Sequence, residues 1–492
     1  MTNGTLPVKR QRTGGGLAEP ESTDDARTRD EQLRRQLLMS LIFPSMLMPM
    51  MSTMSRVALP VIRDTFEIPE DVTAWVSAAF TLTFMTMMSV YGRLGDVIDR
   101  KKLLLFGITV FFCGTSVTLT ADSMPQLILG QMIAGLGVAG MMPLGMALIS
   151  SFFPARDRGR ALGTWATVGP ATGFVGSFIA GFLVAGWGWK GAYVTSWALS
   201  LFAVIAVWKG IPSNPPARDE SRPIRSFDWG GVVLLAAGLA CFVCYLSSRA
   251  ITGVPSLEDW RFLTASVVML TTFVLRERRH PDPFVAPQLL FNLRFAQSSF
   301  CAATRMICMG GLSILIPLYL TDIHGLHPAQ LGAMLVINSG SMALIVRIGG
   351  GLADRWTSRG LVSVGILIQA IVLMIFSRLP GSSSLLVVGL SLGLHGFGAG
   401  LMHAALHRYV MDSVPKERAG AAAGVYNMFR FLGGVIGTSL GGVFLRQYLE
   451  DGVPTIGAYQ QSFFIFVFIG LVGSVMATQL REKRQLATGG GR

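Results

Sequence analysis

The sequence predicts an all-α membrane protein with fourteen transmembrane spans and two related halves. Hydrophobic residues make up 51% of its 492 residues and charged residues only 14%, whereas a soluble protein needs roughly 25% charge to cover its surface. The apolar residues gather in runs of about 20, the length that crosses the hydrocarbon core as a helix. One loop pattern, Gly-x-Leu-x-Asp followed by basic residues, occurs twice between such runs, at 92–96 and 350–354.

The apolar runs, read against the charges and turn residues between them, give the spans. In chain order they are predicted near 37–59, 73–92, 103–121, 125–150, 161–183, 189–209, 228–248, 259–275, 297–320, 329–349, 361–378, 383–407, 418–445 and 459–480.

The charges between the spans test this count and set the orientation, because cytoplasmic loops carry an excess of Lys and Arg. If the N-terminal residues lie in the cytoplasm, the cytoplasmic connections between spans contain basic clusters such as those at 100–102, 156–160 and 276–279. The outer connections contain only Arg63, Lys190, Arg249, Arg261, Arg378 and Arg446. A miscounted span would place every later loop on the opposite side of the membrane and destroy this separation of charge. We therefore predict a multi-pass protein of the cell membrane (plasma or inner membrane) with both chain ends cytoplasmic.

The distribution of charged and reactive residues excludes several classes of function. The net charge of +13 comes from short clusters at span ends, so no nucleic-acid binding is expected. Residues 135–140 match G-x-G-x-x-G but lie within an apolar run without a preceding strand, so no dinucleotide site is predicted. The five cysteines lie in apolar runs without a ligand set, and the spans lack clustered acids. We therefore expect no metal site, no cofactor and no enzyme activity.

Four further motifs accompany the doubled loop. They are Val-Ala-Leu-Pro at 57–60, Phe-Asp-Trp-Gly at 227–230, Arg-Glu-Arg-Arg-His-Pro-Asp-Pro at 276–283 and Arg-Phe-Leu-Gly-Gly at 430–434. Together with the span count, these motifs resemble the major facilitator superfamily, and within it the fourteen-span drug:proton antiporter branch associated with multidrug efflux. The resemblance covers nearly the whole membrane part of the chain.

The resemblance implies two pseudo-symmetric six-helix bundles around a central cavity, formed by residues 36–210 and 296–480. Residues 211–295 would form a linker with two inserted transmembrane helices. Residues 1–35, polar and of mixed charge, are expected to be a disordered cytoplasmic tail, and 481–492 a second cytoplasmic tail. By resemblance the protein is a secondary active transporter that exports a small molecule by alternating access, as a monomer, in exchange for protons.

The doubled loop is predicted to form an inner gate that holds the two bundles together. Asp96 and Asp354 are placed to cap or pair with a helix end and a nearby arginine, and Gly92 and Gly350 would let helices approach closely. Arg347 is expected to serve Asp354. The predicted gate residues are Gly92, Asp96, Arg100, Gly350, Asp354 and Arg355. A simple basic loop is the alternative.

The fifth span carries a second signal, a face of small residues beside Pro170. Its members recur at i, i+4, i+7 and i+11: Gly169, Gly173, Gly176 and Ala180. This face resembles the antiporter motif of the superfamily, although Phe174 replaces its second glycine. Close packing of helices is the alternative role.

Two departures from the family pattern affect the proton coupling that the resemblance implies. Relatives place an Asp in span one, but residues 50–56 contain no carboxylate, and the arginine usual in span four is replaced by Gln131. Every Asp and Glu falls in a tail, a loop or the predicted gate. Histidine can carry a proton where arginine cannot, so His395 or His403 is the best carrier, with Asp96 as an alternative. Each histidine could instead bond to a neighbouring helix.

The polar groups that remain in the spans are the candidate substrate or coupling residues, because charge within a bilayer is costly and usually faces a cavity or a partner. Arg305 and Arg430 lie too deep to reach the interface, whereas Arg56 could extend to it. The candidates are Arg56, Gln131, Arg305, Asn338, His395, His403, Asn427 and Arg430.

A cavity with positive groups and no acid disfavours lipophilic cations. We therefore expect a neutral or anionic amphipathic substrate, with the methionine-rich segment 46–54 as an adaptable apolar wall or as lipid-facing filler. An organic-anion symporter or facilitator of the same fold is the first alternative. A non-transporting receptor is remote, since no loop is long enough for a soluble domain.

Overall fold

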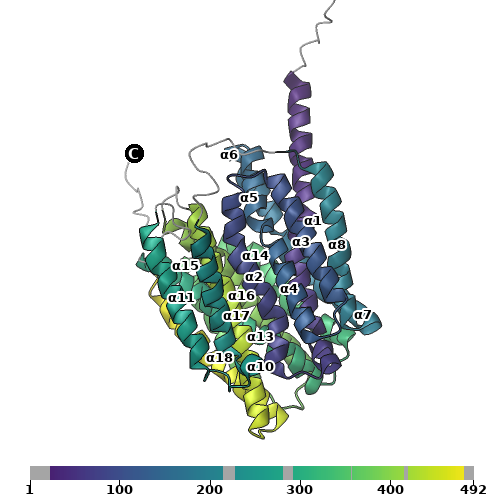
Figure 1. Cartoon of the computed structure of the whole chain (residues 1–492), viewed down its shortest axis with the longest axis vertical. Coiled ribbons are helices and arrows are strands. Elements are labelled where there is room, and N and C mark those ends of the chain that lie inside the picture. The colour runs from purple at the N-terminus through teal and green to yellow at the C-terminus, as the bar shows by residue number, and fades with distance from the viewer. Residues whose placement is uncertain (1–22, 214–227, 281–291, 356, 415–418, 481–492) are drawn as a thin grey trace, which may run out of the picture.

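A computed structural model describes residues 23–213, 228–280, 292–355, 357–414 and 419–480, and its regular elements are all helices. The long helices run side by side. The N-terminal end of the first described helix and the C-terminal end of the last one lie on the same side of the bundle (Figure 1). We call this side the terminal end and the opposite side the distal end.

The helices follow the predicted spans in order. The first part of the chain forms α1 (Thr23–Phe66), α2 (Glu70–Leu94), α3 (Arg100–Leu119), α4 (Met124–Val138), α5 (Met141–Phe152), α6 (Ala155–Ala166), α7 (Val168–Trp187) and α8 (Trp189–Gly210). Then come α9 (Trp229–Leu246), the short α10 (Arg249–Thr252) and α11 (Trp260–Arg279). The last part forms α13 (Leu293–Asp322), α14 (Pro328–Arg355), α15 (Ser358–Phe376), α16 (Leu385–Asp412), α17 (Ala419–Glu450) and α18 (Thr455–Thr478).

Proline breaks two predicted spans into two helices each. Span four divides at Ala139–Gly140 into α4 and α5, and span five divides at Thr167 into α6 and α7. A proline has no N–H, so the carbonyl four residues earlier loses its helical hydrogen bond. Pro143 lies four residues after Ala139, and Pro170 lies four residues after Ala166, the last residue of α6, which explains why continuous apolar runs do not form continuous helices.

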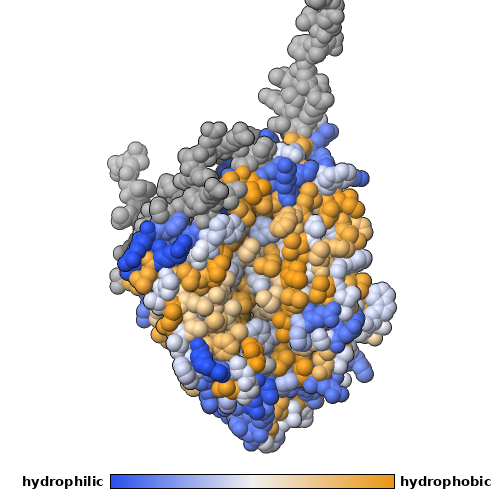
Figure 2. Space-filling view, viewed as in Figure 1, coloured by the Kyte–Doolittle hydropathy of each residue, from blue (hydrophilic) through white to orange (hydrophobic). Residues whose placement is uncertain are grey.

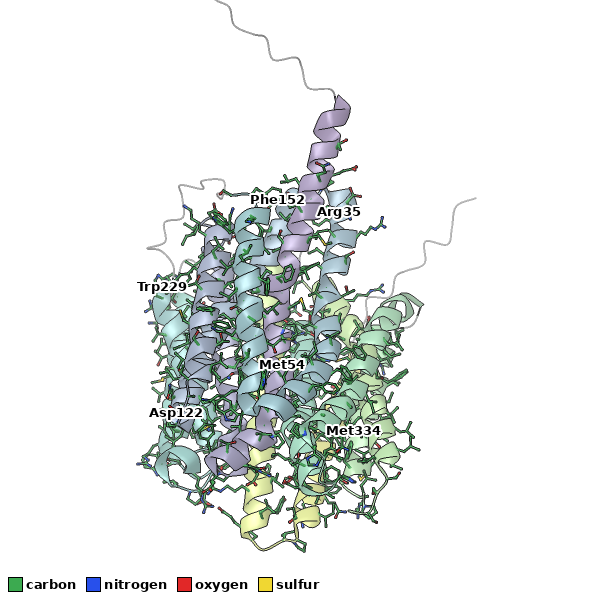
Figure 3. All side chains as sticks on the ribbon, turned by 90° about the vertical axis from the view of Figure 1, so that its right-hand side faces the viewer. Arg35, Met54, Asp122, Phe152, Trp229 and Met334 are labelled. Carbon is green, nitrogen blue, oxygen red and sulfur yellow. The ribbon has the colours of Figure 1, made fainter. Side chains whose placement is uncertain are left out.

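The first helix corrects the predicted disordered tail. Residues 23–35 are helical and continue α1 beyond the rest of the bundle at the terminal end (Figures 1 and 3). Extending an existing helix needs no new nucleus, and this segment is rich in good helix formers. At the edge of the bundle, Arg34 Nε donates to the carbonyl of Phe152 at 3.2 Å. The rest of the tail, residues 1–22, lies outside the described residues.

The bundle has the surface of a membrane protein. In the described chain, thirteen stretches are long and apolar enough to cross a membrane. Figure 2 shows apolar side chains across the middle of the face and polar ones toward both ends. The predicted eighth span, α11, does not meet this criterion, because charged residues at both of its ends shorten its apolar part. It still packs along α9, its partner in the inserted pair.

Most contacts lie within two groups of helices, α1–α8 and α13–α18, and a few helix pairs connect these groups. The connecting pairs with the most extensive contact are α7 with α14 and α2 with α17, and α1 also meets α13. Gly181 and Gly332 permit the first contact, since a Cβ on Gly332 would lie 2.7 Å from the carbonyl oxygen of Ser177. The two groups therefore meet along helix pairs that could move as units.

Charged side chains hold the two inserted helices together and cap their ends. Asp228 caps α9 through the Gly231 N–H at 2.8 Å and accepts a hydrogen bond from Arg276 Nε of α11 at 2.7 Å. Asp259 caps α11, and its hydrogen bonds from Arg261 lower the pKa of its carboxyl to about 2.

Candidate functional site

Two buried arginines lie on adjacent helices in the second group. Arg305 of α13 is 2% exposed and Arg430 of α17 is 8% exposed. At 1.5 Å per residue, each lies about 17 Å from the terminal end of its helix, close to mid-membrane depth. The helices approach closely because Gly433 and Gly437 face α13, where an added Cβ would meet backbone oxygens at 2.3 and 2.1 Å. The two guanidinium charges are consequently near enough to interact.

Neither arginine has an acidic partner within the described chain. Arg305 Nη1 donates to the carbonyl of Ala399 at 3.4 Å, Nη2 lies 3.5 Å from the sulfur of Met306, and Nε has no partner. The Arg430 guanidinium lies over the ring of Phe431, 4.5 Å from its centroid, and its Nε is also unpaired. Buried charge is normally paired with an opposite charge or a ligand. Two neighbouring cations without one form an unusual site.

Aromatic rings extend from these arginines toward the terminal end. His403 and His407, one turn apart on α16, have ring centroids 5.0 Å apart, and His407 lies at the same distance from Tyr426 of α17. The charges of Arg305 and Arg430 act on both histidines, which places the four side chains in one cluster. We call Arg305, Arg430, His403, His407 and Tyr426 the cationic cluster.

His395 belongs to a separate hydrogen-bonded network. It is 1% exposed, and its Nδ1 and Nε2 lie 3.4 Å from Asn338 Nδ2 and 3.3 Å from Gln369 Nε2. A neutral imidazole has one donor and one acceptor nitrogen, so one amide must present its oxygen. Turning the Gln369 amide does this and also pairs its Oε1, which otherwise lacks a partner. Sequence analysis missed Gln369, because a lone polar residue in an apolar run gives no sign of its partner.

The other candidates form no hydrogen bond with the cationic cluster within the described residues. Gln131 of α4 is fully buried, and neither its amide oxygen nor its nitrogen has a hydrogen-bond partner. Asn427 Oδ1 is likewise buried and unpaired. Arg56 Nη2 donates to Ser52 Oγ at 3.4 Å, one turn away on α1. Unpaired buried polar atoms are rare in proteins, and these mark places that a water molecule or a ligand would occupy.

The methionine-rich segment of α1 faces inward. Met50, Met51 and Met54 are buried, and Met46 and Met48 are partly buried. The Met50 sulfur lies 3.2 Å from where a Cβ on Gly176 would stand. Lipid-facing filler is therefore the wrong interpretation for this segment, which packs inside the bundle.

The first copy of the doubled loop differs in detail from the predicted gate. Asp99, not Asp96, caps α3, by accepting from the Lys101 N–H at 2.8 Å, and Asp96 is exposed. Gly92 has room for a methyl group, with Pro143 Cβ at 3.7 Å, whereas a Cβ on Gly95 would lie 2.5 Å from Leu144. The close approach is thus made three residues later than predicted, since the chain turns at Gly95.

Arg100 ties this loop to α5. Its Nε donates to the Gly95 carbonyl at 3.1 Å and its Nη1 to Ser151 Oγ at 2.6 Å. The other predicted gate residues, Gly350, Asp354 and Arg355, and also Arg347, have side chains outside the described part of the structure.

The small-residue face of α7 packs tightly over only part of its length. Gly169 has open space around it and Gly173 has only Thr53 Oγ1 at 3.8 Å, so close helix packing, the alternative role for this face, does not describe these two positions. Gly176 and the buried Ala180 do face neighbours. The ring of Phe174, which replaces a family glycine, reaches across to α14, 2.9 Å from the position of a Cβ on Gly340.

At the distal end, two ion pairs join the two groups of helices. Arg63 at the end of α1 makes a bidentate pair with Asp322 of α13, both distances being 2.7 Å. Arg446 of α17 donates to the buried Asp71 of α2 at 2.7 Å. We call these four residues the distal clamp. Sequence analysis treated them as loop charges, because nothing in the sequence pairs residues 259 and 375 positions apart.

Comparisons with known proteins agree on one family. The family model described as Major Facilitator Superfamily matches residues 41–438 and 298–490. The Multidrug resistance protein Stp of Mycobacterium tuberculosis (strain CDC 1551 / Oshkosh) is 28% identical over 409 residues, which cover 81% of this chain and 75% of that protein. The Tetracenomycin C resistance and export protein of Streptomyces glaucescens is 25% identical over 417 residues, covering 85% and 77%.

A solved structure shares the fold. The bacterial homologue of the human lysosomal transporter Spinster matches with a TM-score of 0.64 at 15% identity, covering 91% of this chain and 96% of that one. Two independent kinds of similarity, in sequence and in helix arrangement, thus extend over nearly the whole described bundle.

Proposed function

Because this chain belongs to the Major Facilitator Superfamily and is a secondary transporter, we propose that it exports a small neutral or anionic amphipathic molecule, as a monomer, in exchange for protons. The observation that carries the substrate preference is the pair of buried arginines, Arg305 and Arg430, with no acidic partner in the described chain. A cation entering this site would meet two like charges in a medium of low dielectric constant. The relatives named for drug and tetracenomycin C resistance support export as the direction.

The proposed mechanism is alternating access between two rocking bundles, residues 36–210 and 296–480. The distal clamp supports a state that is shut at the distal end, and the open space around Gly169 supports access from the terminal end. The positively charged loops at the terminal end support a cytoplasmic position for it. In this state, the cationic cluster would receive substrate from the cytoplasm, and rupture of the distal clamp would release it outside.

Within this mechanism, the doubled loop remains the proposed inner gate and the Gly169–Gly176 face with Pro170 the proposed antiporter element. For proton exchange, we propose His403 as the carrier in preference to His395. His403 continues through His407 to the terminal end, whereas both ring nitrogens of His395 are engaged by amides. A histidine with a free route to one side can gain and lose a proton there during each cycle.

Everted membrane vesicles, whose lumen corresponds to the cell exterior, test this proposal. We expect accumulation of an anionic dye such as carboxyfluorescein in the lumen when the lumen is acidic, and little accumulation of ethidium, a cation. Flux without any effect of the pH gradient would contradict proton exchange. Ethidium accumulation unchanged by Arg305→Ala and Arg430→Ala would contradict the substrate preference. Flux only in the opposite direction would favour an organic-anion importer of the same fold.

A further inference from the structure

We infer that Arg305 and Arg430 form a binding site for one oxyanion group, a carboxylate or sulfonate, of the transported molecule. The inference rests on the proposed function for the identity of this ligand as the substrate, and it deepens that proposal by naming the site and the group bound. Three features of the two side chains carry it: their free donors, their uncompensated charge and their position beside a contact between the two groups of helices.

The free donors match the geometry of an oxyanion. Arg305 uses Nη1 and Nη2 locally, but its Nε–H has no acceptor. The Arg430 guanidinium lies over the ring of Phe431, and its Nε–H has no hydrogen-bond acceptor within the described chain. Guanidinium edges bind carboxylates through paired N–H···O bonds in the plane of the group. Two such donors from adjacent helices can each hold one oxygen of the same oxyanion.

The uncompensated charge explains why an anion would stay. Two neighbouring cations in a buried site repel each other, and a bound anion replaces that repulsion with two attractions. The groups around them in the described chain are His403, His407 and Tyr426, none of which offers a negative charge at neutral pH. The ligand is therefore the available source of compensation.

The position of the site suits a transported ligand. Phe431, beneath the Arg430 guanidinium, meets Phe84 of α2 edge to face, with ring centroids 5.0 Å apart at 81°. This contact joins α17 to the other group of helices, so the oxyanion site adjoins the surface along which the two groups would move. An anion that draws Arg430 off Phe431 acts directly on that contact.

Thermal unfolding of the purified protein in neutral detergent tests the site without a pH gradient. The measured Tm therefore does not depend on whether the protein exchanges protons. The probes are acetate and acetamide, which differ in charge but hardly in size, compared at equal ionic strength with sodium chloride. We expect acetate to raise the Tm by at least about 2 °C at saturation relative to acetamide. The double variant Arg305→Gln/Arg430→Gln should lose this difference. Arg35→Gln, at an exposed position on α1, should keep it.

Several outcomes would overturn the inference. No acetate-specific rise in the wild type, or an equal rise in the double variant, removes the site. If the double variant does not fold, Arg430→Gln alone must reduce the rise by at least about half. Repeating the titration with added phosphatidylglycerol or phosphatidylcholine identifies the occupant. Loss of the acetate response with phosphatidylglycerol only would assign the site to a lipid headgroup and contradict its assignment to substrate.

Discussion

At the scale of single residues, hydrogen-bond partners separate two kinds of buried polar group in the second half of the chain. His395 has an amide on each ring nitrogen, as a side chain that stabilises helix packing should. Arg305 and Arg430 keep unpaired donors at similar burial. Burial alone therefore does not separate these groups, and the proposed site rests on burial combined with charge and an unpaired donor.

This difference predicts opposite effects for two histidine variants. His403→Gln should abolish the effect of a pH gradient on transport, because it removes the proposed proton carrier while leaving the His395 network intact. His395→Gln should lower the Tm, by loss of one or two buried hydrogen bonds worth about 1–3 kcal/mol in all, and retain the pH effect. Dye flux in everted vesicles over a series of lumenal pH values measures the pH effect of both variants, and thermal unfolding measures the Tm. A retained pH effect in His403→Gln, with its loss in His395→Gln, would reverse the assignment.

At the scale of helices, α7 is packed differently at its two ends. Its distal part packs so closely on α14 that a Cβ on Gly181 would lie 2.9 Å from the Pro328 carbonyl, while Gly169 has space around it. The glycines of α7 thus do not share one role. Those that make helix contact are structural, and the one in open space is available for movement.

Matched glycine substitutions check this division. Gly181→Ala should destabilise the protein by about 1–3 kcal/mol through overpacking against α14, and the loss is read as a lower Tm. Gly169→Ala should leave the Tm within about 1 °C, and if the proposed antiporter role is right it should still reduce proton-driven flux. Equal destabilisation by the two variants would contradict the packing described for α7.

At the scale of the whole molecule, the distal clamp joins helices from both groups at their ends. Arg63, Asp322, Asp71 and Arg446 connect α1 to α13 and α2 to α17, the helices that also make the cross-group contacts. Charge-assisted bidentate pairs are among the stronger polar contacts. Removing one should shift the population toward molecules that are open at this end.

Cysteine accessibility measures that shift. In a cysteine-free background, Leu331→Cys places a thiol at a buried position that lines a distal cavity of about 250 Å³ beside Val57 and Pro60. Arg63→Asp should raise its labelling rate by an impermeant maleimide on the order of tenfold, the change expected for about 1.4 kcal/mol. The swap Arg63→Asp/Asp322→Arg should restore slow labelling. Equal rates in all three proteins would show that the clamp does not hold this end shut.

The sequence predicts the parts of this molecule that follow from local composition. Apolar length gives the spans, and it fails only where Pro143 or Pro170 interrupts a helix or where charges shorten α11. It also identifies Arg305, Arg430 and His395 as buried polar groups. It does not identify what each one touches, because Gln369, Ala399 and the clamp partners come from distant segments whose pairing depends on helix packing. For the same reason, it places the close approach at Gly92 and not at Gly95.

The two unpaired arginines also have an electrical consequence. If the site moves through even part of the membrane field, each charge contributes up to about 2.3 kcal/mol per 100 mV. In the proposed orientation, with the terminal end in the cytoplasm, a negative interior would draw the empty, doubly positive site inward, where substrate would be loaded. A bound anion reduces that pull and eases the outward step. Anion efflux from proteoliposomes should therefore vary with a valinomycin-imposed potential, and the same flux at all potentials would contradict movement of these charges.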